Sequence, residues 1–162
     1  MRRAVASAAL ALLALPAAAL AVPGGPSDGT LAVTSATGSV SIAARGALIG
    51  QLDRGKVVLE DPDPKDGKQP VVWGYESKRD VTDTKALYAG TNIRFRIIGG
   101  FFRVKVVGSG MDLSLVGHGS VTLSPLFGLI SAGTYSVNGE DEVRFPDQLT
   151  SVQLGAPPAP GG

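Results

Sequence analysis

Few residues of this chain have types and spacings that could do chemistry, and the most notable are four cations around a glycine pair. Arg94 and Arg96 alternate with apolar residues before Gly99-Gly100, and Arg103 and Lys105 do so after it. Two glycines between alternating runs are typical of a two-residue hairpin, because both central residues can adopt positive φ. The predicted register places the cations opposite each other on one face: Arg96 faces Arg103, and Arg94 faces Lys105.

Two interpretations of this cationic face remain open. Like charges directly across a strand pair are unfavourable by about 0.2–1 kcal/mol each. On an exposed sheet the long side chains can splay into water, where such repulsion is weak. Alternatively, the four side chains bind an anionic partner, which would be an envelope polymer, a lipid headgroup or an acidic protein patch. This second interpretation defines the candidate binding residues: Arg94, Arg96, Arg103 and Lys105.

The sequence argues against several kinds of catalysis. One histidine and no cysteine exclude Cys/His proteolysis, thiol redox chemistry and zinc sites of the usual Cys/His composition. His118 could form a triad with Asp112 and Ser114, since a triad is defined by geometry and not by chain order. We expect instead an exposed His118 at the tip of a second hairpin, Gly117–Gly119. No catalytic residue and no cofactor are therefore assigned.

A cluster of carboxylates lies between Glu60 and Gly67 and resembles the opening of a calcium-binding loop. Lys65 holds the third ligand position, however, and no glutamate stands at the twelfth. A glycosidase pair is also unsuited to one loop, because the two carboxyl groups must flank the substrate. The sequence thus predicts a solvated loop and no metal site.

Two apolar features have both a structural and a functional interpretation. Trp73 is expected to be a core aromatic, or else to form a carbohydrate-stacking pair with Tyr75, because residues two apart share a strand face. The run Leu126–Ile130 stands where turn residues are expected. We favour a lid over an open end of the core, and the alternative is an exposed patch that marks an interface.

The elements that position these residues are predicted to be β-strands. Short apolar alternations separated by glycines are typical of hairpin-connected strands. A shift of about 64 positions aligns Leu31 with Phe95, Val40 with Val104, and turn Asp53–Gly55 with Gly117–Gly119. We therefore predict an all-β, antiparallel, hairpin-rich sandwich, with a small barrel as the alternative, built from two pseudo-repeats. One domain would span 30–154, with halves of about 30–90 and 91–154.

The first residues predict export. Arg2 and Arg3 precede an apolar stretch, and Ala19 and Ala21 provide a signal-peptidase pattern, which predicts a leader over 1–21. The composition of this leader favours bacterial export. Beyond it we expect a flexible linker over 22–29, a flexible Pro/Gly tail over 155–162 and no transmembrane segment.

Charge and composition limit the functions that the chain can have. The formal net charge is +1, and it falls close to zero once the two leader arginines are lost, which argues against a nucleic-acid partner. The sequence predicts a non-enzymatic β domain, secreted or periplasmic, that acts by surface interaction at or outside the bacterial cell envelope. The alternative is a small secreted hydrolase with a carboxylate-based site that the sequence does not locate.

Overall fold

The computed structural model describes residues 28–155, and every regular element in this range is a β-strand. Two strands are very long, β1 (Gly29–Glu60) and β4 (Lys85–Ser124), and they pair antiparallel. Five short strands complete the sheet: β2 (Val71–Trp73), β3 (Ser77–Thr82), β5 (Ala132–Val137), β6 (Val143–Arg144) and β7 (Thr150–Leu154). The all-β antiparallel prediction is confirmed, whereas the barrel alternative is wrong because the sheet does not close.

The two long strands form a ribbon that coils back alongside itself. Val40 of β1 pairs with Val106 on one side and with Leu123 on the other. Leu48 likewise pairs with both Ile97 and Leu115. Most β1 residues from Ser39 to Glu60 thus have two β4 neighbours, 17 or 18 residues apart in the chain, which is the length of one turn of the coil.

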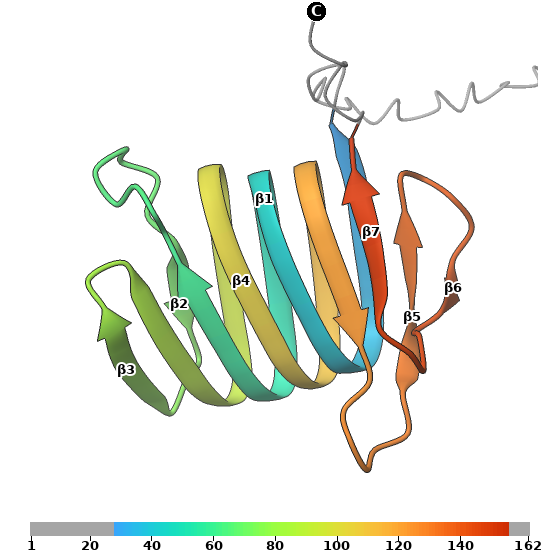
Figure 1. Cartoon of the computed structure of the whole chain (residues 1–162). Helices are drawn as coiled ribbons and strands as arrows, with labels where there is room; N and C mark the ends of the chain where they lie inside the picture. Colours follow the sequence, from blue (N-terminus) through green and yellow to red (C-terminus); the bar gives the residue numbers. More distant parts are fainter. Residues whose placement is uncertain (1–27, 156–162) are drawn as a thin grey trace, which may run out of the picture.

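The coil is flattened into two facing layers, which Figure 1 shows as the near and far runs of the ribbon. We call them the front and back layers. The front layer contains, in order of pairing, β3, 85–89, 56–60, 101–107, 39–45, 119–124 and β7. The back layer contains β2, 91–98, 47–54, 111–116, 29–34, β5 and β6.

Glycines lie where the ribbon bends from one layer to the other. Gly99 and Gly100 both have φ of 75°, in the region that favours glycine. At Gly55 a Cβ atom would lie 2.1 Å from the carbonyl oxygen of Val107, so the neighbouring strand leaves no room for a side chain. These bends let a continuous ribbon reverse direction without a loop.

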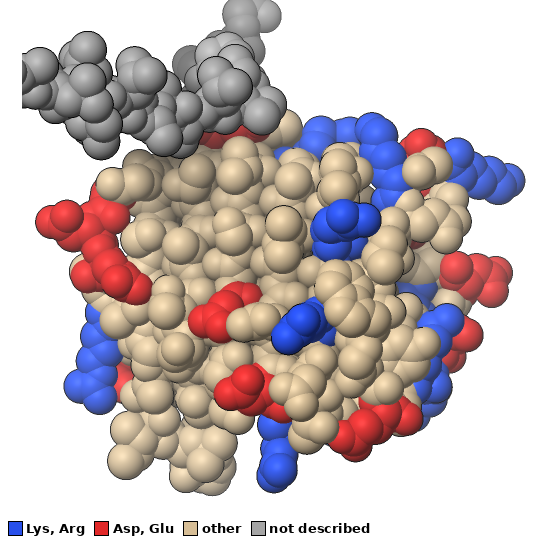
Figure 2. All heavy atoms as spheres, turned by 180° about the vertical axis from the view of Figure 1, so that it is seen from behind, with Lys and Arg blue, Asp and Glu red and all other residues tan. Residues whose placement is uncertain are grey.

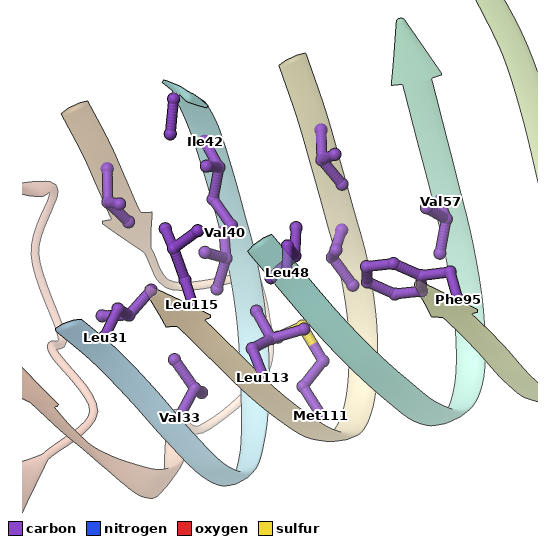
Figure 3. Packing of buried hydrophobic residues seen from close by; sticks show 14 of the residues in the cluster. Leu31, Val33, Val40, Ile42, Leu48, Val57, Phe95, Met111, Leu113 and Leu115 are labelled. Atoms are coloured by element: carbon purple, nitrogen blue, oxygen red, sulfur yellow. The ribbon is translucent and has the colours of Figure 1, made fainter. Parts of the chain in front are cut away.

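The core lies between the layers and is built mainly by alternation of buried and outward-facing side chains along the ribbon. Ile93, Phe95 and Ile97 are buried, while the arginines between them are exposed. Figure 3 shows side chains from successive turns meeting in this interior. The largest fully buried side chains are Phe95, Phe102, Phe145, Leu31, Leu48, Leu52, Ile93, Ile97, Met111, Leu115, Leu123 and Val40. Each layer therefore has one face in the core and one face available to solvent.

The predicted hairpin at Gly99-Gly100 is wrong. Ile97 pairs with Leu48 and Phe102 pairs with Ala44, so the segments on either side of the glycines pair with β1 and not with each other. The predicted tips Asp53–Gly55 and Gly117–Gly119 also lie inside long strands. A glycine-marked bend into the opposite layer leaves the same local pattern as a hairpin, because side chains still alternate between core and solvent.

The predicted lid is also wrong, because Phe127 and Ile130 are 107% and 83% exposed. The predicted leader and the tail from residue 156 onward lie outside the described residues, as does the linker up to residue 27. Within 28–155 there is no helix of the length and apolar character needed to cross a membrane.

Candidate binding grooves on the two outer faces

A groove of about 310 Å³ crosses the outer face of the front layer. We call it the front groove. Its side chains alternate with buried Ile42, Val104 and Val121, which orients them outward. The lining includes Ser41, Ala43, Val58, Glu60, Lys85, Arg103, Lys105, Ser120 and Thr122.

The strand register arranges these residues in two rows. Ser41 pairs with Lys105 on one side and with Thr122 on the other. In the next outward row, Ala43 pairs with Arg103 and with Ser120. The two small side chains of β1 therefore form a floor between a bank of cations and a bank of hydroxyls. The hydroxyl bank continues to β7, where Ser151 Oγ lies 3.1 Å from Thr122 Oγ1.

One carboxylate forms ion pairs with two side chains of the cationic bank. Glu60 Oε1 accepts a hydrogen bond from Arg103 Nη1 at 2.9 Å, and Glu60 Oε2 lies 3.4 Å from Lys85 Nζ. The Arg103 guanidinium carbon also lies 5.2 Å from the centre of the Phe101 ring. Burial raises the pKa of Glu60, but the hydrogen bonds from Lys85 and Arg103 outweigh it and hold the pKa below its ordinary value.

The front groove keeps an excess of positive charge. Three cations and one carboxylate, that of Glu60, line the groove, and Lys105 forms no ion pair within residues 28–155. The hydroxyls of Ser41, Ser120 and Thr122 add donors and acceptors beside these charges. This combination suits an oxygen-rich anion, such as a phosphate or a carboxylate, that crosses from one bank to the other.

A second groove, of about 250 Å³, lies on the outer face of the back layer. We call it the back groove. Trp73 of β2 pairs with Arg94, which pairs in turn with Gln51. Asp112 closes the row and accepts hydrogen bonds from the Gln51 side chain and from the Ser35 backbone, both at 2.8 Å. Figure 2 shows this back face, where scattered charges surround a broad uncharged area.

The four predicted binding residues do not face each other across a hairpin. Arg96 pairs with Ile49 and Val71 in the back layer, whereas Arg103 pairs with Ala43 and Glu60 in the front layer. Arg94 lines the back groove, and Lys105 lines the front groove. The predicted register is therefore wrong, and its reason is the bend at Gly99-Gly100, which sends the second pair of cations to the opposite face.

Sequence reasoning missed Lys85 and the structural role of Glu60. Glu60 was expected in a solvated acidic loop, but it ends β1 and bridges two cations. Lys85 and Arg103 lie 18 residues apart and converge on Glu60 because that separation is one turn of the coil. The available signal in the sequence was the separation of Lys85 and Arg103 by one turn of the coil. This separation can be interpreted only once the coil is known.

Other candidates for chemistry take different partners. His118 Nδ1 lies 3.0 Å from Asp28 Oδ1, and the carboxylate of Asp112 is engaged elsewhere. Tyr75 packs edge-to-face on Tyr88, with ring centres 5.0 Å apart, and not beside Trp73. In the described part of the chain no three His, Asp or Glu side chains are grouped to hold a metal ion.

Comparison with known protein families, with curated proteins and with solved structures found no match for this chain. The functional conclusion therefore depends on the residues of the grooves and on the sequence.

Proposed function

We propose that this chain is an exported, non-enzymatic β domain that binds an anionic partner at or outside the bacterial cell envelope through the front groove. The observation that carries the proposal is the pair of rows Lys105–Ser41–Thr122 and Arg103–Ala43–Ser120, in which cations face hydroxyls across a floor of small residues. Hydrogen bonds between charged groups are stronger than those between neutral ones, and they suit phosphate or carboxylate recognition. Export follows from the leader pattern of the sequence.

The groove favours binding over hydrolysis. A glycosidase-type general acid needs a carboxyl group with a raised pKa. The carboxyl group of the front groove belongs to Glu60, whose pKa is lowered by its two cationic partners. Glu60 is therefore suited to pair with Arg103 and Lys85 as a carboxylate and unsuited to donate a proton at neutral pH.

A charge-removal experiment with a matched control tests this function. Arg103→Gln/Lys105→Gln removes two charges from the front groove, and Arg94→Gln/Arg96→Gln removes two from the back face. Polyphosphate and polygalacturonate serve as anionic probes, with dextran as the neutral probe. We expect the front variant to lose at least tenfold in affinity for the anions, because each charged hydrogen bond contributes about 1.5–3 kcal/mol.

The back variant should retain the affinity of the wild type, and binding should weaken as salt rises, since screening acts over about 8 Å at physiological ionic strength. Equal loss in both variants would mean that only the overall charge matters. Failure of the wild type to bind either anion would reject the function.

We further propose that residues 30–154 form one domain of two sandwiched repeats about 64 residues long. The pairing register supports this. A shift of 64 positions relates Val40 to Val104 and Ile42 to Val106, and the structure pairs Val40 with Val106 and Ile42 with Val104. The pair Gly55–Gly90 corresponds in the same way to Gly119–Leu154. An experimental structure in which 30–60 and 94–124 do not superpose would reject the repeat.

A further inference from the structure

Within residues 28–155, the three most exposed large apolar side chains belong to Phe127, Ile130 and Leu149, which lie near the end of β4. Phe127 and Ile130 are 107% and 83% exposed, and Leu129 and Leu149 are 58% and 72% exposed. Leu149 directly precedes Thr150, which pairs with Leu123 near the end of β4, so it lies at the base of the same connection. Figure 1 shows the connection from β4 to β5 extending beyond the bends of the ribbon. We call Leu126–Ile130 together with Leu149 the apolar tip.

The apolar tip is held in a defined shape. The backbone N–H of Leu129 donates to the carbonyl oxygen of Leu126 at 3.1 Å, and Gly128 has a φ of 79°, as in a type II turn. Ser131 is buried behind the turn, and its hydroxyl donates to the carbonyl oxygen of Pro146 at 3.2 Å. Phe127 is therefore presented at the outer corner of an anchored turn.

The turn of the apolar tip lies in an uncharged segment, and the charged residue closest to Leu149 in the sequence is Asp147. No Lys, Arg, Asp or Glu occurs from Gly119 to Gly139, a segment that contains the turn. An uncharged apolar projection has no electrostatic complement to offer a charged partner. Its contacts must therefore come from burial of apolar surface, which is proportional to the area removed from water.

Shape and area favour a bilayer over a folded partner. A specific protein interface buries about 800 Å² on each side. Four side chains of roughly 150 Å² each supply less than this, and they stand on a convex projection. Hydrocarbon needs no complementary surface and can close around such a projection, and exposed apolar patches mark membrane as well as protein contacts.

We propose that the apolar tip inserts into the outer region of a lipid bilayer and docks the folded domain on the membrane surface, with Phe127 deepest. This interaction is separate from anion binding by the front groove and does not depend on it. It should occur on uncharged lipid and persist at high salt.

The test uses the exported protein and vesicles of phosphatidylcholine, a lipid without net charge. Because the chain has no cysteine, Phe127→Cys accepts a single environment-sensitive dye, and Ile98→Cys is the matched control. Ile98 is 59% exposed and directly precedes Gly99. Figure 1 shows the bend of the ribbon near residue 100 at the end of the molecule opposite the connection from β4 to β5. We expect dye at position 127 to shift to shorter wavelength and to be quenched by lipid-borne quenchers. Dye at position 98 should not respond.

Cosedimentation provides the second measurement. Phe127→Ser/Ile130→Ser should lower vesicle partitioning at least tenfold, whereas Ile98→Ser should not change it. The substituted side chains are exposed, so thermal unfolding should be unaffected. Equal partitioning of wild type and tip variant would overturn the proposal. So would self-association of the wild type without lipid that the tip variant abolishes, because the tip would then be a contact between copies.

Discussion

The two outer faces of this coiled ribbon are built in the same way and differ in what they display. Each carries two of the four cations that flank Gly99-Gly100, and each has a groove across four or five neighbouring strand segments. In the front groove the cations gather around Glu60 and face hydroxyls. In the back groove Arg94 stands between Trp73 and Gln51, and the nearby carboxylate of Asp112 accepts two hydrogen bonds.

The role of a cation in this fold depends more on its neighbours in space than on the residues beside it in the sequence. Arg96 and Arg103 have the same local pattern, each between buried apolar residues. Arg96 pairs with Ile49 and Val71, whereas Arg103 forms an ion pair with Glu60 at one edge of a polar floor. Only the second arrangement concentrates positive charge in a hollow, where it can act on a ligand.

The largest expected effect is on the free energy of unfolding, to which the core shared by the two layers should contribute far more than the outer faces. Phe95→Ala removes a fully buried ring that lies against Gly50, and should cost about 3–5 kcal/mol in the free energy of unfolding. Trp73→Ala, on the outer face, should change it by about 0.5 kcal/mol or less. Denaturant unfolding measures both. A large cost for Trp73→Ala would show that the back face contributes to the fold and is not free for other use.

A smaller effect concerns the carboxylates of the two grooves. Glu60→Gln keeps the shape of the front groove and removes its only carboxylate. We expect affinity for polyphosphate to rise about two- to fivefold, since Glu60 no longer competes for Arg103 and Lys85. The back-face control Asp112→Asn should leave affinity unchanged. Titration calorimetry decides this, and weaker binding by Glu60→Gln would mean that Glu60 is needed to hold the two cations in place.

The smallest expected effect concerns pH. The folded-state pKa of Glu60 is lowered from its ordinary value of 4.5, so its ion pairs stabilise the fold above that pH. This contribution is lost as pH falls through the lowered pKa, because Glu60 then takes up a proton. The difference in melting temperature between wild type and Glu60→Gln should therefore shrink below about pH 4.5. A difference that is independent of pH would contradict the assigned ion pairs.

Much of the fold could be predicted from the alternation of apolar and polar residues along the sequence. The apolar residues that alternate with Arg94 and Arg96, which are Ile93, Phe95 and Ile97, are buried. Gly55 and Gly119 were expected to have positive φ at hairpin turns; both have positive φ, but they lie inside the long strands and not at hairpin tips. Both signals are local, because each depends on one residue and its immediate neighbours.

The sequence did not predict which strand segments pair with each other. The candidate site depends on this pairing and therefore could not be predicted either. A hairpin at Gly99-Gly100 and a bend between layers place the same side chains inward and outward. The choice depends on β1, whose Ala44 and Leu48 take the positions next to Phe102 and Ile97. Contacts such as Glu60–Arg103 span 43 residues and follow from the coil alone.

The most direct test of anion binding by the front groove is a map of where an anion binds on the folded protein. Backbone amide shifts in an NMR titration with polyphosphate report each segment of the two layers separately. We predict that the shifts concentrate in the front layer, on Ser41–Ala43, Arg103–Lys105 and Ser120–Thr122, and fade as salt is raised. Shifts centred on Arg94 and Arg96 in the back layer, or spread evenly over both faces, would contradict the claim that the front groove is the binding site.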